Sequence, residues 1–294
     1  MPSRPLRLYR AASTVCRVVP LTPASWLAQR AGRIFGPRLM PAKASQLARH
    51  LRRVTPEAKQ DVIDEQVRAG FGHYGRFWVE LFTLPRIGAK TVGDRFTVTG
   101  FEHIANSVDA GIGPILALPH LGGWEWAAAW LGRVQDLKVT AVVERLEPDD
   151  VFGWFRQVRS DNGINVVPLG SDALGQLVEA VNDQHVVCLL SDRDIAGNGI
   201  TVKFFGEETT LPPGPALLAR RTGAPILPTA VYFDGRSHHA WVMPPIWADP
   251  EVRLRRDVQR VTQEMATAME ELITQNAEQW HLLVPNWPSD HHES

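Results

Sequence analysis

Short apolar runs of strand length recur between residues 95 and 243, separated by amphipathic stretches long enough to form helices. The runs lie at 95–99, 114–118, 138–143, 164–168, 186–190, 225–232 and 239–243. Helical periodicity occurs between several of them, at 121–132, 149–161, 171–183 and 213–222. Because a helix between two strands carries the chain back to the start of the next strand, this alternation is typical of parallel pairing. We therefore expect an α/β fold with a largely parallel central sheet flanked by helices.

Three further segments extend this fold. Runs at 201–205 and 208–211, joined by a glycine turn, predict an antiparallel insertion. Residues 56–84 have the pattern of one long helix, with proline in its first turn and a wide aromatic face that either packs in the core or lines an apolar ligand groove. Residues 251–277 have the periodicity of a surface helix. Together these features predict one α/β domain over residues 56–294.

The charge of the chain is strongly uneven. The first 53 residues carry eleven formal positive charges, and the first acidic residue is Glu57. The remaining residues, 20 basic and 32 acidic, sum to a charge of -12. Such polarity indicates a polyanionic partner for the N-terminal end, which is either nucleic acid or the anionic leaflet of a membrane.

Apolar side chains are interspersed with these basic residues, so the segment is amphipathic as well as cationic. This combination favours a membrane surface over nucleic acid, although a transit peptide or a solvated helical arm would have a similar composition. No run reaches the roughly eighteen apolar residues that a spanning helix needs, and Arg17 and Pro20 interrupt the one candidate signal core. We expect residues 1–55 to form basic amphipathic, membrane-associating helices that hold the protein peripherally on the cytoplasmic face of the cell membrane, without a nucleic-acid partner.

A histidine and a glutamate flank a glycine pair where the run at 114–118 ends, in the sequence His120-Leu121-Gly122-Gly123-Trp124-Glu125. On an unbroken helix the two charged side chains would lie about 140° apart around the axis and could not touch. If the glycines break the helix, Glu125 falls in the first helical turn and its carboxylate can orient the imidazole of His120. Such a pair can remove a proton from an alcohol at neutral pH, with backbone N–H groups of the helix start near the developing oxyanion.

Other charged residues also follow predicted strands. Asp192, Arg193 and Asp194 come after the run at 186–190, and Glu144 follows the run at 138–143. Ligands collect at the carboxyl ends of the strands in open α/β sheets, so these side chains and Arg159 are candidates for substrate binding. One of the two aspartates is also a candidate partner for His120. The alternative is that they form loop salt bridges.

Several familiar sites are missing from the sequence. It has no G-x-S-x-G elbow, no phosphate-binding G-x-x-x-x-G-K-[ST] loop, no G-x-G-x-x-G after a strand, and no H-E-x-x-H or paired C-x-x-C metal motif. We expect no metal site and no bound cofactor. Direct attack by a substrate alcohol is then the simplest chemistry for His120.

The segment LALPHLGGWE at 116–125 resembles the H-x4-[DE] block of the lysophospholipid acyltransferase superfamily, in its bacterial lipid A and phosphatidylinositol mannoside acyltransferase branch. Many members have Asp where this chain has Glu125, whose carboxylate reaches one methylene further. Further blocks resemble the family in the same order: LLSDRD at 189–194, VKFFGE at 202–207, LPPGPA at 211–216, TGAP at 222–225 and QWHLLVP at 279–285. The resemblance spans about residues 60–290.

This resemblance implies transfer of a long acyl chain from acyl-CoA to a hydroxyl of an anionic membrane glycolipid, such as a mannose of phosphatidylinositol mannoside. It also implies that His120 is the general base and Glu125 the acidic member of the motif. Enzymes that acylate lipid A share these sequence blocks, so a lipid A-type acceptor is an alternative. Two other functions are also alternatives: a thioesterase or phosphoesterase that uses the same histidine and carboxylates, and a lipid carrier without activity. No feature of the sequence identifies a protein partner.

Overall fold

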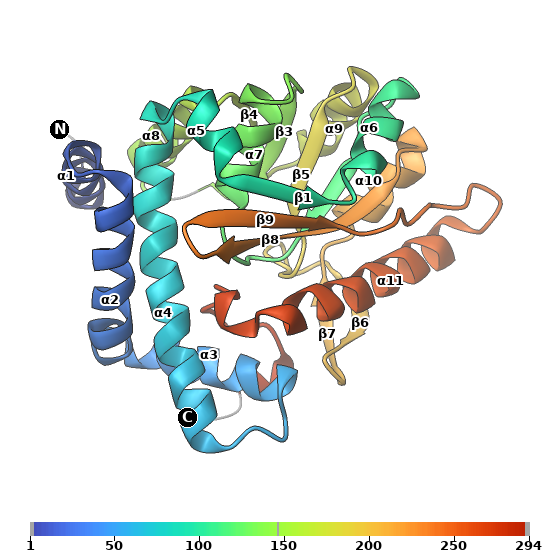
Figure 1. Ribbon diagram of the computed structural model, residues 1–294. Helices are drawn as coiled ribbons and strands as arrows, with labels where there is room; N and C mark the ends of the chain where they lie inside the picture. Colours follow the sequence, from blue (N-terminus) through green and yellow to red (C-terminus); the bar gives the residue numbers. More distant parts are fainter. Residues whose placement is uncertain (1–2, 146, 292–294) are drawn as a thin grey trace.

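A seven-stranded sheet forms the centre of the molecule (Figure 1). The computed structural model describes residues 3–145 and 147–291. Neighbouring strands run parallel except for the antiparallel pair β8 and β9, which confirms the prediction of a largely parallel sheet. In spatial order the strands are β1 (Phe96–Thr99), β9 (Ser237–Val242), β8 (Ile226–Asp234), β2 (Ile115–Leu118), β5 (Val186–Leu190), β3 (Val139–Val143) and β4 (Ile164–Pro168).

Helices cover both faces of this sheet, because successive side chains of a strand point to opposite sides. Ile115 and Ala117 of β2 pack into an apolar cluster with α9 (Ala173–Asn182), α10 (Gly214–Thr222) and α11 (Leu254–Gln275). Leu116 and Leu118 of the same strand pack into a second cluster with α5 (Ala89–Asp94), α6 (Phe101–Asp109) and α7 (Trp124–Arg133). The expectation of flanking helices is confirmed.

The insertion is a separate two-stranded antiparallel sheet of β6 (Ile200–Phe204) and β7 (Glu207–Leu211). Gly206, in the turn, has φ +80, a conformation that favours glycine. The hairpin packs against α11, to which the backbone N–H and C=O of Lys203 hydrogen-bond through Gln263. The predicted insertion and final helix are both present, and α11 is somewhat shorter than expected.

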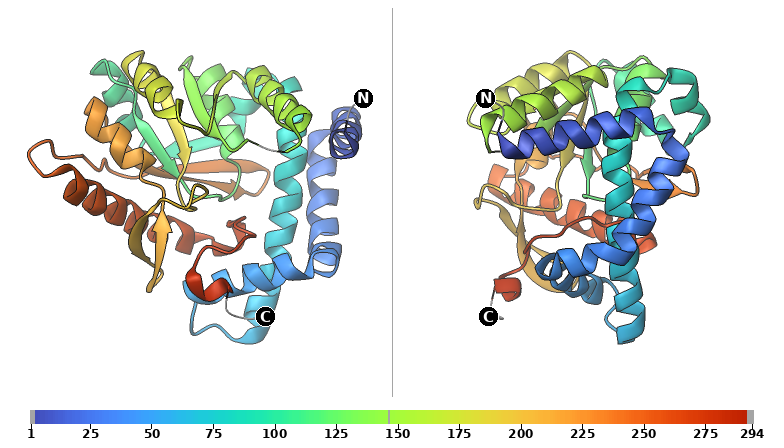
Figure 2. Two further views of the ribbon diagram at one scale, coloured as in Figure 1. Left: turned by 180° about the vertical axis from the view of Figure 1, so that it is seen from behind. Right: turned by 90° about the vertical axis from the view of Figure 1, so that its left-hand side faces the viewer.

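The long helix α4 (Gln60–Thr83) is present as predicted, but it begins at Gln60 because Lys59 is extended, so Pro56 lies outside it. α1 (Arg4–Val18), α2 (Leu21–Leu39) and α3 (Pro41–Val54) precede it in the chain. Figures 1 and 2 show α2 running alongside α4, with α1 across the top of α4 and near α8 (Asp149–Asp161). N-terminal helices are therefore confirmed as part of the fold.

Glycine brings α2 and α4 close together. A Cβ added at Gly32 would lie 2.2 Å from the carbonyl oxygen of Phe71, and one at Gly75 would lie 2.7 Å from that of Ala28. Both helices therefore approach backbone to backbone, and larger side chains would force them apart. Within the described residues, no helix combines the length and the apolar character needed to cross a bilayer.

Candidate active site

The imidazole of His120 is hydrogen-bonded to the carboxylate of Asp192. His120 follows β2 and Asp192 follows β5, and these strands are parallel neighbours whose carboxyl ends lie side by side. The ring Nδ1 of His120 is 2.6 Å from Oδ1 of Asp192, and the backbone N–H of His120 donates to Oδ2 at 2.9 Å. Both carboxylate oxygens of Asp192 are therefore bonded to His120.

Asp192 is fully buried and is held by residues near the end of the chain. The indole N–H of Trp280 donates to its Oδ2 at 2.7 Å, and the side-chain amide of Asn286 donates to its backbone carbonyl at 3.0 Å. Burial raises the pKa of the Asp192 carboxyl, but the charge and hydrogen bond of the His120 ring and the Trp280 and backbone donors outweigh it, so this pKa lies below its ordinary value. Asp192 is thus ionised at neutral pH.

An ionised Asp192 fixes the tautomer of His120. A carboxylate only accepts hydrogen bonds, so Nδ1 must carry the proton and Nε2 is left with a free lone pair. The His120 side chain keeps 24% of its surface exposed, while that of Asp192 has none. The ring can therefore accept a proton from a molecule on its open side.

The glycine pair after His120 turns the chain from strand to helix. Gly122 has φ +61, and a Cβ there would lie 1.8 Å from the carbonyl oxygen of Val231. The N–H of Gly122 bonds to the carbonyl of Gln279, and the N–H of Gly123 bonds to that of Val231. These two N–H groups are committed to the protein, so an oxyanion at the start of α7 would have to use other donors.

Glu125 lies in the first turn of α7, as the sequence predicts, but it does not hold the imidazole. Its carboxylate accepts hydrogen bonds from Arg159 of α8, with Nε at 2.8 Å and Nη2 at 2.7 Å. The side chain of Glu125 is buried, with 6% of its surface exposed. The expected contact between Glu125 and His120 is therefore wrong, because α7 directs the glutamate toward α8 and leaves the ring to Asp192. Arg159 is accordingly the partner of Glu125.

Glu144 and Arg193 form an ion pair at the carboxyl ends of the strands. Arg193 lies 3.7 Å from Glu144 in a half-exposed ion pair that joins the ends of β3 and β5. This corresponds to the loop salt bridge considered from the sequence. Both side chains lie near the carboxyl ends of strands, where a substrate could reach them.

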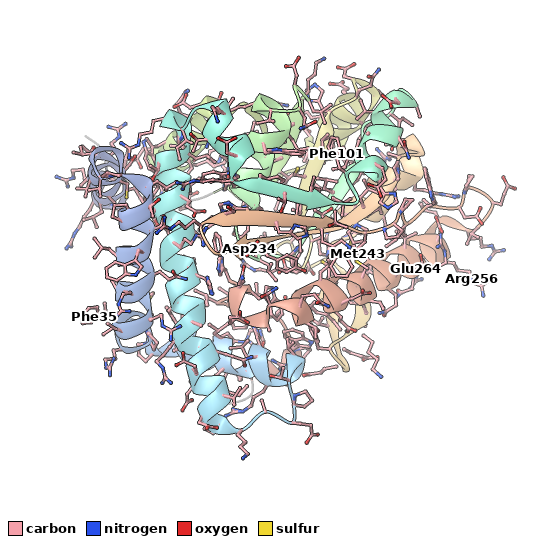
Figure 3. All side chains as sticks on the ribbon, viewed as in Figure 1. Phe35, Phe101, Asp234, Met243, Arg256 and Glu264 are labelled. Atoms are coloured by element: carbon pink, nitrogen blue, oxygen red, sulfur yellow. The ribbon has the colours of Figure 1, made fainter. Side chains whose placement is uncertain are left out.

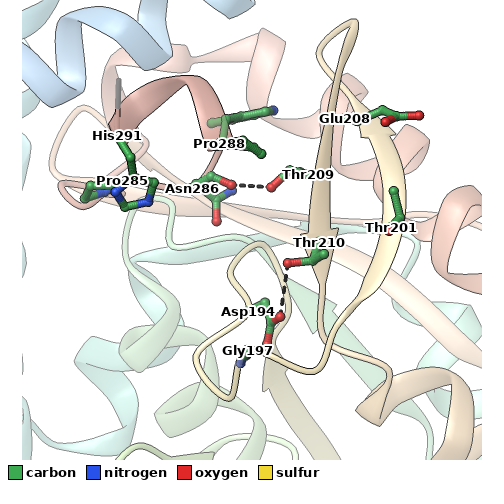
Figure 4. Close-up of a pocket in the computed structure, with 11 residues that line it drawn as sticks. Asp194, Gly197, Thr201, Glu208, Thr209, Thr210, Pro285, Asn286, Pro288 and His291 are labelled. Carbon is green, nitrogen blue, oxygen red and sulfur yellow. Dashed lines mark hydrogen bonds between the residues drawn. The ribbon is translucent and has the colours of Figure 1, made fainter. Parts of the chain in front are cut away.

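The carboxylate of Asp194 organises its own loop. Its carboxylate accepts hydrogen bonds from the N–H groups of Gly197 and Gly199, at 2.9 and 2.7 Å, and from the hydroxyl of Thr210 on β7, at 3.0 Å. Asp194 and Thr210 line a pocket of about 380 Å³ whose wall also includes Asn286. These residues are drawn in Figure 4. The three charged residues 192–194 thus diverge to three different partners.

His281 is a further residue at this site. Its backbone N–H donates to the carbonyl of His120 at 2.6 Å, and its buried ring lies among Phe77, Trp124 and Phe233. Burial lowers the pKa of its imidazole well below the ordinary value, so the ring is neutral. The run at 279–285 was noted in the sequence, but the pattern did not indicate that Trp280 and His281 contact the histidine and aspartate.

The aromatic face of α4 takes part in the same region. Phe77 packs on Trp124 with ring centroids 4.4 Å apart, and the Trp124 ring contacts that of His120 at 5.9 Å. Phe71 is buried in a separate cluster, whereas Phe82 is buried in the same cluster as Phe77 and Trp124. The core-packing interpretation of this face holds for these residues, and Phe77 and Trp124 also form an apolar wall beside His120.

Metal ligation is not supported by any cluster in residues 3–145 and 147–291, where no three His, Cys, Asp or Glu side chains converge. The chemistry available to the site is that of an ionised aspartate, a histidine with a free Nε2 and an apolar wall. These groups suit proton removal from a hydroxyl.

Comparisons with known proteins identify the family of this chain. The family model described as bacterial lipid A biosynthesis acyltransferase matches residues 5–289. The phosphatidylinositol mannoside acyltransferase of Mycolicibacterium smegmatis is 36% identical over 249 residues, which cover 83% of this chain and 80% of that protein. The protein of the same name from Mycobacterium tuberculosis is 35% identical over 254 residues, 85% of this chain and 78% of that protein. This chain therefore belongs to the bacterial lipid A biosynthesis acyltransferase family.

Proposed function

We propose that this protein transfers a long acyl chain from acyl-CoA to a mannose hydroxyl of a phosphatidylinositol mannoside, with His120 as the general base. The observation that carries the proposal is the 2.6 Å hydrogen bond between Nδ1 of His120 and Asp192, which leaves Nε2 free to accept a proton. The acyltransferase family and the names of the similar mycobacterial proteins support the reaction class and the acceptor. A thioester donor fits a site with no serine nucleophile elbow, since the acceptor hydroxyl can attack directly.

In the proposed reaction, Nε2 of His120 takes the proton of the acceptor hydroxyl as its oxygen attacks the thioester carbonyl carbon. Asp192 stabilises the resulting imidazolium without becoming protonated. The tetrahedral intermediate collapses, the carbon–sulfur bond breaks, and the CoA thiolate takes the proton from the imidazolium. The products are the acylated glycolipid and free CoA. The Phe77 and Trp124 wall beside the ring suits the apolar acyl chain.

The N-terminal helices supply the proposed contact with the membrane. Large apolar side chains lie exposed along the outer sides of α1 and α2, among them Val18, Leu27, Phe35 and Leu39, while basic residues lie between them. Phe35 lies on the side of α2 away from α4 (Figure 3). A cationic surface with exposed apolar side chains suits the interface of an anionic leaflet. Because acyl-CoA is a cytosolic metabolite, the cytoplasmic face is the proposed location.

The experiment mixes the purified protein with palmitoyl-CoA and a mannosylated phosphoinositide in detergent. Thiol release is followed, and the lipids are identified by mass spectrometry. We expect an acylated glycolipid from the wild type, none from His120→Ala, and normal turnover from His103→Ala, a matched histidine on α6. Free fatty acid in place of the acylated glycolipid would make the protein a hydrolase, and full turnover by His120→Ala would refute the assignment of the base.

A further inference from the structure

The bend between α1 and α2 forms one side of a second pocket, which we call the elbow pocket. It has a volume of about 360 Å³, and its wall includes Pro20 and Thr22 at the bend, and Arg86, Thr91 and Arg95 from the segment that leads into β1. This volume lies in the range of roughly 300–1,000 Å³ that is common for small-molecule sites. Figure 2 (right) shows α1 and α2 meeting at the bend, with α5 beside it. The pocket thus lies between the basic N-terminal helices and the α/β body.

The wall of the elbow pocket is cationic. Arg86 donates from Nη2 to the backbone carbonyls of Cys16 and Val19 at 2.9 and 2.6 Å, and Arg95 donates from Nη2 to the hydroxyl of Thr22 at 3.3 Å. All these acceptors are neutral, and no carboxylate is among the described residues that line the pocket. Each guanidinium has five N–H donors, so both arginines keep donors for a ligand. Two guanidinium groups with nearby hydroxyls favour a phosphate oxyanion, which such groups bind with short, charge-assisted hydrogen bonds.

The surroundings of the pocket favour a lipid as the source of this phosphate. Val18, just before the bend, is 79% exposed, and Trp26 and Leu27, two turns after it, are 55% and 56% exposed. Exposed apolar side chains on the two helices that meet at a cationic pocket match the boundary between acyl chains and headgroups, where lipid phosphates lie. A pocket for a soluble phosphate compound would not require exposed tryptophan and leucine on the helix that forms one side of it.

We propose that the elbow pocket binds the phosphate of an anionic phospholipid headgroup through Arg86 and Arg95. This inference rests on the membrane contact in the proposed function, but it concerns a site separate from His120. Because Arg86 also holds the last carbonyls of α1, a bound phosphate would lie directly against the bend and fix α1 and α2 relative to the α/β body.

Two substitutions test the pocket without removing Arg86. Arg95→Gln removes one charge. Thr91→Glu places a carboxylate in the pocket at the exposed third residue of α5, where an acidic side chain is favourable for the helix. The matched controls are Arg255→Gln and Thr267→Glu, which make the same changes of charge at exposed positions of α11.

The measurement is co-sedimentation of the full chain with vesicles of phosphatidylcholine alone and with added phosphatidylinositol. We expect Arg95→Gln to weaken binding to the anionic vesicles about fivefold, since one arginine near a membrane contributes about 1 kcal/mol. Thr91→Glu should weaken it at least as much. The two control variants should bind within twofold of the wild type, and binding to phosphatidylcholine should be the same for all.

Equal losses in pocket and control variants would mean a diffuse charge effect and would overturn the proposal. A second outcome would also overturn the proposal: inorganic phosphate stabilises the wild type against heat, and both pocket variants lose this stabilisation but keep full vesicle binding. The pocket would then bind a soluble phosphate compound. Acyl transfer in detergent separates this inference from the proposed function: the pocket variants should keep wild-type turnover there. If the wild type transfers no acyl group and the pocket variants still lose vesicle binding, the pocket stands and the proposed function fails.

Discussion

Glu125 and Arg159 form a buried ion pair, 2.7 Å between Oε1 and Nη2, that joins the first turn of α7 to the last turn of α8. The acidic residue of the H-x4-E pattern therefore positions a helix and an arginine, while Asp192 holds the imidazole. The two carboxylates have different partners, so their substitution should have different consequences.

Replacing Glu125 by Gln leaves the guanidinium of Arg159 mostly buried without its counter-charge. We expect a loss of about 2–4 kcal/mol in the free energy of unfolding, measured by urea denaturation. Glu179→Gln, at an exposed position of α9, should change it by less than about 0.5 kcal/mol. The pH dependence of acyl transfer by Glu125→Gln should keep its shape, since Asp192 still orients the ring; a displaced profile would show that Glu125 acts on the imidazole.

Replacing Asp192 by Asn should lower kcat/KM for acyl transfer by a factor on the order of 10²–10⁴, because an amide can hold the wrong tautomer of His120 and cannot stabilise the imidazolium. Steady-state kinetics would measure the loss. The double variant with His120→Ala should be no slower than His120→Ala alone, since the two residues act as a unit. An additive loss in the double variant would contradict this pairing.

Replacing Gly122 by Ala should reduce the free energy of unfolding by about 3 kcal/mol or more, since φ is +61 and the new Cβ would overlap the carbonyl of Val231. Gly153→Ala is the control. Gly153 lies exposed within α8, and a Cβ there meets nothing within 4 Å, so alanine should stabilise the protein by about 0.5–1 kcal/mol. Chemical denaturation distinguishes the two, and a tolerated alanine at 122 would count against the described turn.

Stability should fall between neutral pH and pH 4 because of the partly buried His73 of α4. Burial, followed by the charges of Arg76 and Arg33, lowers the pKa of His73 to about 4. An unfolded histidine has a pKa near about 6.5, so between these values the unfolded chain binds more protons. The contribution of neutral His73 to the free energy of unfolding is therefore complete above about pH 6.5 and is lost as the pH falls toward 4. Urea midpoints across this range should have a smaller slope in His73→Gln, whereas His103→Gln should match the wild type.

Replacing Phe35 by Glu should weaken binding to anionic vesicles while the thermal unfolding temperature stays close to that of the wild type. The side chain is 55% exposed, so its loss removes apolar contact with the membrane and little from the core. Leu254→Glu, at a similarly exposed position of α11, is the control and should bind normally. Unchanged binding of Phe35→Glu in co-sedimentation would exclude the outer face of α2 from the membrane contact.

Local patterns predicted the elements of the fold well. The runs at 114–118 and 186–190 correspond to β2 and β5, and the stretch at 149–161 coincides with α8. Two helices begin later than the sequence pattern predicted. α7 begins at Trp124 because Gly122 takes a left-handed conformation, and α4 begins after the extended residue Lys59. These differences are small because the period of apolar residues follows directly from helix and strand geometry.

The arrangement around His120 was predicted only in part. The sequence identified the histidine and named Glu125, Asp192 and Asp194 as its candidate partners without deciding among them. The structure pairs His120 with Asp192, 72 positions away, and holds that aspartate with Trp280, 88 positions further. No local spacing contains this information.

The order of apolar and polar residues by itself determined an α/β chain, a histidine at the end of a strand and a cationic amphipathic N-terminal segment, because each is a property of neighbouring residues. Only the tertiary structure decided which carboxylate meets the imidazole and that Arg86 and Arg95 line a pocket at the α1–α2 bend. The physical reason is that the parallel register of β2 and β5, and the packing of the N-terminal helices on the body, bring together residues from distant parts of the chain.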